Sequence, residues 1–121
     1  MELELKFEEK RPPRKFLVGR TDEKISISDC GDVHLDANEQ VTMISLNGKR
    51  HDFVSKEWGF YATPSVNGRL KKEGFKTALV QNSSGQIYIM VVDKDSLEEF
   101  ELYCTMEKQQ VLEWLDERKT K

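Results

Sequence analysis

The feature that most constrains the fold is the dipeptide Asn47-Gly48, which lies between two runs typical of β-strands. Asn-Gly is the preferred pair for a two-residue type I′ turn, so residues 39–54 are predicted to form a β-hairpin. In that register Ile44 lies opposite His51, and both share one face of the sheet with Phe53. The other face is expected to carry Val41, Met43, Asp52 and Val54.

A second hairpin is predicted over residues 76–92, with its turn at Asn82–Gly85. Its return strand, Ile87–Val92 (IYIMVV), is apolar at every position. A strand with two apolar faces is typical of the middle of a sheet that is covered on both sides. We therefore expect this strand to be central.

The N-terminal region alternates Leu3, Leu5 and Phe7 with charged residues, which predicts a strand with one buried face. Its charged face suits the edge of a sheet, or an arm that pairs with a partner. The RPPR run at residues 11–14 is expected to break this pairing as an extended connector. Short strands are predicted at 15–20 and 24–28, followed by a turn-rich stretch at 29–39 with a brief strand at Val33–Leu35.

Two helices are predicted after the first hairpin. Thr63-Pro64 is a typical helix start and Gly74 a typical stop, so a short central helix is expected from Pro64 to Glu73. Near the C-terminus, Ser96 and Glu99 fit a capping box. Apolar residues then recur at helical spacing, which indicates either one long helix or two helices that break near Thr105: Leu97, Phe100, Cys104, Val111 and Leu115.

The order of these elements predicts a small antiparallel α+β domain. It has two hairpins, an N-terminal strand region, a short central helix and a C-terminal helix, and no regular βαβ alternation. We divide the chain into an N-terminal edge strand or arm at 1–14 and a single α+β domain at 15–121. A length of 121 residues is sufficient for one domain with its own core.

Composition narrows the classes of partner. The net charge of −3 argues against nucleic acid, because phosphate binding requires a basic surplus or a basic face. No segment resembles a signal peptide or a membrane span, so neither export nor a membrane partner is expected. Cys30 and Cys104 are far apart and lack metal-binding context, which favours a reduced chain in the cytoplasm.

The stretch Trp58–Phe75 is the best candidate for a binding surface. A helix N-terminus presents free N–H groups that suit a phosphate or a carboxylate, and aromatic rings nearby offer a stacking wall. The predicted ligand-binding residues are Trp58, Tyr61, Thr63, Ser65, Asn67 and Arg69. The simpler interpretation is that the aromatic side chains belong to the core and that Thr63 only caps the helix.

Evidence for catalysis or for metal binding is sparse. His51 is the candidate general acid/base, because imidazole titrates near neutral pH. Asp32, His34 and Asp36 recur at a spacing of two residues and are the candidate metal ligands, although they match no zinc or calcium motif. No nucleophile motif and no glycine-rich phosphate loop occurs, so we expect no cofactor.

Three functions are consistent with these residues. The first is a non-enzymatic binding or accessory domain that holds a small anionic ligand (a sugar, a nucleotide or a carboxylate) or a partner chain at Trp58–Phe75. The second is a homodimeric interaction protein that pairs through the strand of Leu3, Leu5 and Phe7. The third is a small isomerase or lyase, in which His51 acts with Tyr61 or Arg69 and all face one cleft.

Overall fold

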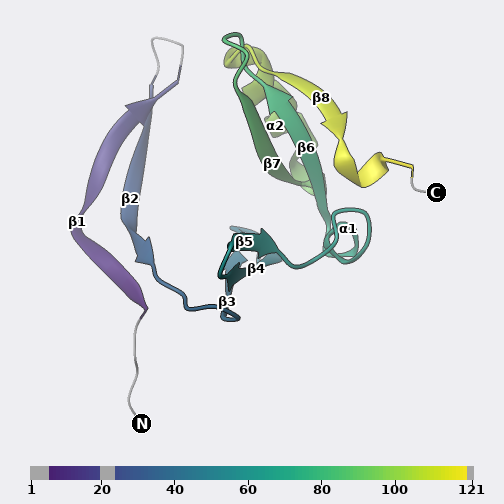
Figure 1. Ribbon diagram of the computed structural model, residues 1–121. Helices are drawn as coiled ribbons and strands as arrows, with labels where there is room; N and C mark the ends of the chain where they lie inside the picture. Colours follow the sequence, from purple (N-terminus) through teal and green to yellow (C-terminus); the bar gives the residue numbers. More distant parts are fainter. Residues whose placement is uncertain (1–5, 20–23, 120–121) are drawn as a thin grey trace.

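The computed structural model describes residues 6–19 and 24–119 and shows three antiparallel sheets in chain order (Figure 1). A two-stranded hairpin comes first, a three-stranded meander follows, and a three-stranded sheet carries the longer helix. The predicted α+β class is confirmed. The elements are β1 (Phe7–Val18), β2 (Ile25–Val33), β3 (Gln40–Ile44), β4 (Arg50–Lys56), β5 (Gly59–Ala62), α1 (Arg69–Lys72), β6 (Phe75–Gln81), β7 (Ile87–Asp93), the 3-10 turn η1 (Lys94–Ser96), α2 (Leu97–Met106), β8 (Gln110–Trp114) and the 3-10 turn η2 (Leu115–Glu117).

The first hairpin, β1–β2, is longer than the sequence indicates. Pairing lapses between Glu9 and Arg14, where the RPPR run lies, and then resumes. One strand therefore crosses residue 14, where the boundary of the arm was expected. The turn-rich prediction for 29–39 is wrong at its start, because β2 continues to Val33. Gly31 permits this pairing, since a Cβ there would collide with the backbone oxygen of Glu8. Leu3 and Leu5 lie outside the described residues.

The β3–β4 hairpin forms where Asn47-Gly48 predicts it, but its register differs by one residue. Ser45 accepts the N–H of Gly48 at 2.9 Å and pairs with Lys49, so the loop contains three residues instead of two. Gly48 has φ +81°, which completes a type I turn with a bulge. The predicted type I′ turn is therefore wrong, and His51 lies opposite Met43 instead of Ile44. A shift of one residue exchanges the faces of the whole strand.

The central helix is shorter than predicted. Only Arg69–Lys72 is helical, and Gly68 occupies the N-cap position in place of Thr63. Ser65 stabilises this start instead, because its Oγ accepts the backbone N–H of Arg69 at 3.3 Å. The predicted stop is confirmed: Gly74 has φ +101°, and its N–H bonds to the oxygen of Lys71.

The C-terminal part of the chain corrects three further predictions. The strand order of its sheet is β7-β6-β8, so β6 is central and the apolar strand β7 lies at an edge. Val111 belongs to β8, which pairs with β6, and Leu115 begins a 3-10 turn; neither extends the helix. α2 ends at Met106, and Lys108 then adopts φ +54°, which reverses the chain. The predicted capping box is absent, since Ser96 makes no side-chain cap and Asp93 caps the preceding turn.

The core surrounds β6 and the short helix α1. Its buried apolar residues are Leu70, Phe75, Ala78, Val80, Val92 and Cys104. Lys49 ties the meander to this core by an ion pair with Asp93, and Asn47 donates to the same carboxylate at 2.8 Å. These two hydrogen bonds, with Lys49 the larger cause, lower the pKa of Asp93 to about 2.

The chain as a whole is open. Figure 1 shows the β1–β2 hairpin standing apart from the C-terminal sheet, with the meander between them at one end. Each of the three sheets leaves large apolar side chains in solvent, among them Leu17 on β1, Phe60 on β5 and Ile89 on β7. Within 6–19 and 24–119, no helix is long and apolar enough to cross a membrane.

Candidate functional site

The meander brings four of the six predicted ligand-binding residues to one face, which we call the aromatic face. Tyr61 pairs with Val54, so its side chain lies on the same side of the sheet as Asp52. Trp58, whose surface is 71% exposed, stacks on Tyr61 with ring centroids 6.0 Å apart. Thr63 comes two residues after Tyr61 and accepts a hydrogen bond from Arg69 Nη2 at 3.0 Å.

Arg69 is already engaged by the protein. Its Nη1 lies 3.2 Å from Asp52 Oδ2, and Thr42 Oγ1 donates to the other carboxylate oxygen at 2.6 Å. The hydrogen bond from Thr42, followed by that from Arg69, lowers the pKa of Asp52. This chain of contacts holds α1 against the meander. An anion at the aromatic face would have to compete with Asp52 for the guanidinium.

The remaining two predicted residues occupy the turn before α1. Ser65 is exposed, yet its Oγ is used to cap Arg69, and Asn67 is exposed in the turn. The helix has four residues and starts at a glycine. The predicted anion site at a helix N-terminus therefore lacks its helix, because so short a segment aligns few peptide dipoles.

His51 lies on the opposite face of the meander from Tyr61. Successive side chains of β4 point to alternate faces of the sheet. Val54 lies three residues beyond His51, so Val54 and its partner Tyr61 point to the other face. The imidazole is buried against the rings of Phe53 and Phe75, with centroids at 4.6 and 6.3 Å. Its Nδ1 has no hydrogen-bond partner among the described residues. The expected single cleft for His51 and Tyr61 is wrong.

Burial lowers the pKa of His51 below its ordinary value of 6.5. The unfolded chain thus binds the proton more readily, so the stability that His51 contributes is complete above pH 6.5 and is lost as the pH falls through the lowered pKa. His51→Phe is expected to remove this part of the pH dependence without destabilising the chain at neutral pH. Thermal melts of wild type and His51→Phe across the mildly acidic range measure this change of Tm with pH. His34→Phe at an exposed position is the control, and an equal flattening in both variants would contradict this assignment.

The candidate metal ligands do not converge. Asp32 pairs with Lys10 at 2.8 Å, His34 with Glu8 at 2.9 Å, and Asp36 with Lys6 at 3.3 Å. Each of the three therefore has its own partner. Across the described ranges, no group of three or more histidine, cysteine or acidic side chains is placed to hold a metal ion.

The sequence interpretation missed an apolar groove on the second face of the meander. It has a volume of about 930 Å³ and runs from the end of β2 across β3, β4 and β5. Its apolar lining includes Val33, Leu35, Val41, Met43, Phe53 and Phe60. The correct hairpin register would have predicted it, since that register places Met43 and Val41 on one face with Phe53.

Comparisons with protein-family models, with curated proteins and with solved structures found no match for this chain. The site must be interpreted from its own geometry.

Proposed function

We propose that this chain is a non-enzymatic interaction module that binds another polypeptide across its apolar surfaces. The observation that carries the proposal is the set of large apolar and aromatic side chains that the meander leaves in solvent: Met43, Ile44, Trp58, Phe60 and Tyr61. Large exposed apolar areas on a folded chain are typical of protein interfaces. The cytoplasmic location expected from the sequence is part of this proposal.

The distribution of the apolar side chains supports a polypeptide partner. Phe60 and Met43 line the groove and are largely exposed, while Trp58 stands on the opposite face of the same sheet. Aromatic and methionine side chains are enriched at the centres of protein interfaces. Lys6 and Asp36 at the groove already form an ion pair with each other, so the rest of the lining suits an apolar segment of a partner better than a small anion.

The test of this proposal is dye binding at high dilution. The fluorescence of an apolar dye such as ANS is expected to rise strongly with the wild-type chain, because the dye reports exposed apolar surface. Replacing Met43 and Phe60 together by aspartate is expected to remove a large part of the signal. Leu46→Asp is the control, because Leu46 is fully exposed at the turn and lies outside the groove. A wild-type signal no higher than that of a compact protein would refute the proposal.

A small anionic ligand at the aromatic face is the second candidate. It is favoured by the stacked pair Trp58–Tyr61 and by the partly exposed Arg69 on the same face. A nucleotide or a sugar phosphate that binds only the folded chain is expected to raise the Tm. Trp58→Ala is the informative variant, because Arg69→Ala would also release Asp52. A shift of equal size in wild type and Trp58→Ala would exclude this face.

A further inference from the structure

Strand β7 is an unprotected sheet edge. Among the residues that the structure describes, β6 is its sole partner, and the pairing from Phe75–Asp93 to Gln81–Ile87 has no register shift. Its first six residues contain no charge and no proline. Natural edge strands usually carry a charge, a proline or a bulge that prevents further pairing. The opposite edge strand, β8, has such an irregularity, because Leu112 is an extra residue between Val111 and Glu113, which pair with Val80 and Leu79 of β6.

The register shows which backbone groups of β7 face outward. Asn82 donates to the oxygen of Gln86, and Lys94 donates to the oxygen of Gly74, both at 2.9 Å. Hydrogen-bonded and non-hydrogen-bonded pairs alternate along an antiparallel ladder. The backbone groups of Tyr88, Met90 and Val92 therefore form the hydrogen bonds to β6. The N–H and C=O groups of the intervening residues point away from β6: Ile87, Ile89 and Val91.

We infer that β7 pairs antiparallel with β7 of a second copy of this chain, about a two-fold axis at Ile89. This inference rests on the proposed function and adds a second surface to it, the β7 edge, whose partner is another copy of the chain. The two three-stranded sheets then form one continuous sheet of both copies, which is β-strand addition in a closed, symmetric form.

The sequence of β7 selects this register. With the axis at Ile89, each Ile87 lies opposite Val91 and each Asp93 lies opposite Gly85, so no like charges meet. A shift of one residue, with the axis at Met90, would place Asp93 opposite Ile87 and bury its carboxylate beside an apolar side chain. Either axis pairs the outward-facing backbone groups with one another, so the side chains decide the register.

The unburied area fits a second copy. β7 leaves four large apolar side chains in solvent for a partner to cover: Ile87, Tyr88, Ile89 and Val91. Part of that apolar surface lines a cleft of about 450 Å³ between the β1–β2 hairpin and the β7 edge. Val18, Ile25 and Ile27 of the hairpin face Tyr88 and Met90 there. The partner's Tyr88 and the partner's Met90 share that side of the extended sheet and would fill the cleft.

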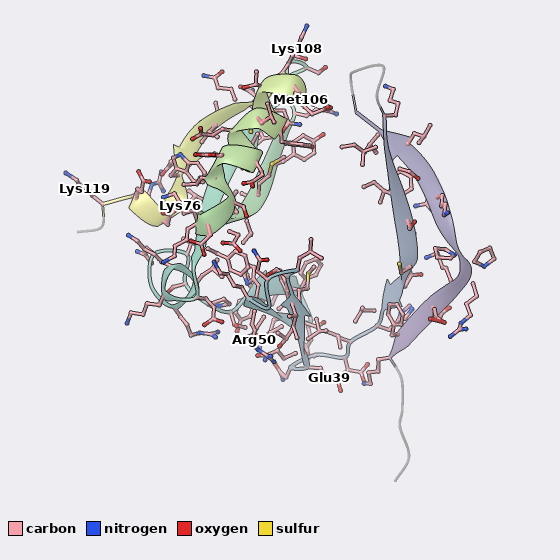
Figure 2. All side chains as sticks on the ribbon, turned by 180° about the vertical axis from the view of Figure 1, so that it is seen from behind. Glu39, Arg50, Lys76, Met106, Lys108 and Lys119 are labelled. Carbon is pink, nitrogen blue, oxygen red and sulfur yellow. The ribbon has the colours of Figure 1, made fainter. Side chains whose placement is uncertain are left out.

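The position of the hairpin supports this arrangement. Figure 2 shows Met106 and Lys108 at the end of α2 that lies far from Glu39 and Arg50 of the meander. The hairpin reaches this end of α2 just after β1, because a Cβ on Gly19 would lie 3.4 Å from Glu107 Oε1. This end of the hairpin therefore lies beside the C-terminal end of α2, next to the cleft that Tyr88 and Met90 line.

Sedimentation of the full chain over a wide range of concentration tests the dimer. The expected mass is twice 14.1 kDa. Ile89→Lys is expected to shift the equilibrium to the monomer, since the two lysines would lie directly opposite each other at the axis and repel. Ile44→Lys is the matched control: Ile44 lies on edge strand β3 and is 59% exposed, against 60% for Ile89. A wild-type chain that remains monomeric throughout would overturn the inference.

A cysteine series tests the register even if Ile89→Lys fails to fold. In a Cys30→Ser background, Ile89→Cys is expected to form a disulfide-linked dimer on mild oxidation, because hydrogen-bonded partners have Cα atoms about 5.5 Å apart. Ile87→Cys is the control, since its two copies would be about 13 Å apart along the strands. Cross-linking at residue 87 in preference to residue 89 would overturn the register. Absence of cross-linking together with strong dye binding would reject the second copy and leave the proposed function standing.

Discussion

Asp116→Ala is expected to lower the free energy of unfolding by about 3 kcal/mol, near the lower end of the range for breaking a buried ion pair. The Asp116 side chain is fully buried, accepts the backbone N–H of Thr77 at 3.0 Å, and lies 2.8 Å from Lys76 Nζ. Burial raises the pKa of this carboxyl, but Lys76 and the N–H of Thr77 outweigh that effect and leave it lowered. Without the Asp116 carboxylate, the buried backbone N–H of Thr77 on the central strand β6 would lose this hydrogen-bond acceptor.

Urea denaturation followed by circular dichroism measures this loss. Asp116→Asn is expected to be intermediate, because the amide keeps an acceptor for Thr77 and removes only the charge. Glu117→Ala is the control, since Glu117 contacts the same Lys76 at 2.6 Å but is mostly exposed, and exposed pairs contribute little. An equal decrease in the free energy of unfolding for Asp116→Ala and Glu117→Ala would show that burial does not strengthen the interaction of Asp116 with Lys76.

Leu70→Ala is expected to lower the free energy of unfolding by about 3 kcal/mol, within the usual range for truncating a buried leucine. Leu70 is 0% exposed and is the buried residue of α1. A helix of four residues is not stable alone, so its position depends on this side chain. The loss is therefore expected to loosen the ion pair of Arg69 with Asp52 as well.

The same denaturation experiment with Leu102→Ala provides the matched control. Leu102 lies on α2 and is 60% exposed, so the same truncation removes little buried surface. The difference between the two variants isolates burial from the change of residue type. If Leu70→Ala and Leu102→Ala lower the free energy of unfolding equally, Leu70 does not anchor α1.

The candidate site was predictable in part. Trp58, Tyr61, Thr63 and Arg69 were predicted to act together, and they lie on one face of the meander. The partner that occupies Arg69 was not predicted. Asp52 lies 17 positions earlier in the chain, and only the pairing of β4 with β5 places it beside Thr63 and Arg69. The groove was missed for a similar reason, since its lining depends on the register of the hairpin.

The sequence by itself determined the antiparallel α+β class, the positions of both later hairpins and the stop at Gly74. These features depend on signals within a few residues: Asn47-Gly48, the turn at 82–85, and a glycine that accepts a positive φ. Such preferences act before any distant segment is in place.

The tertiary structure alone decided which strand is central and that a strand succeeds α2. The apolar run of β7 suits the middle of a sheet, yet β6 takes that place because β8 pairs with its other edge. Val111 fits a helical spacing after Cys104, but the hydrogen bonds that β6 offers make a strand there more favourable. Pairing between segments some thirty residues apart along the chain is a non-local interaction, and no local pattern encodes it.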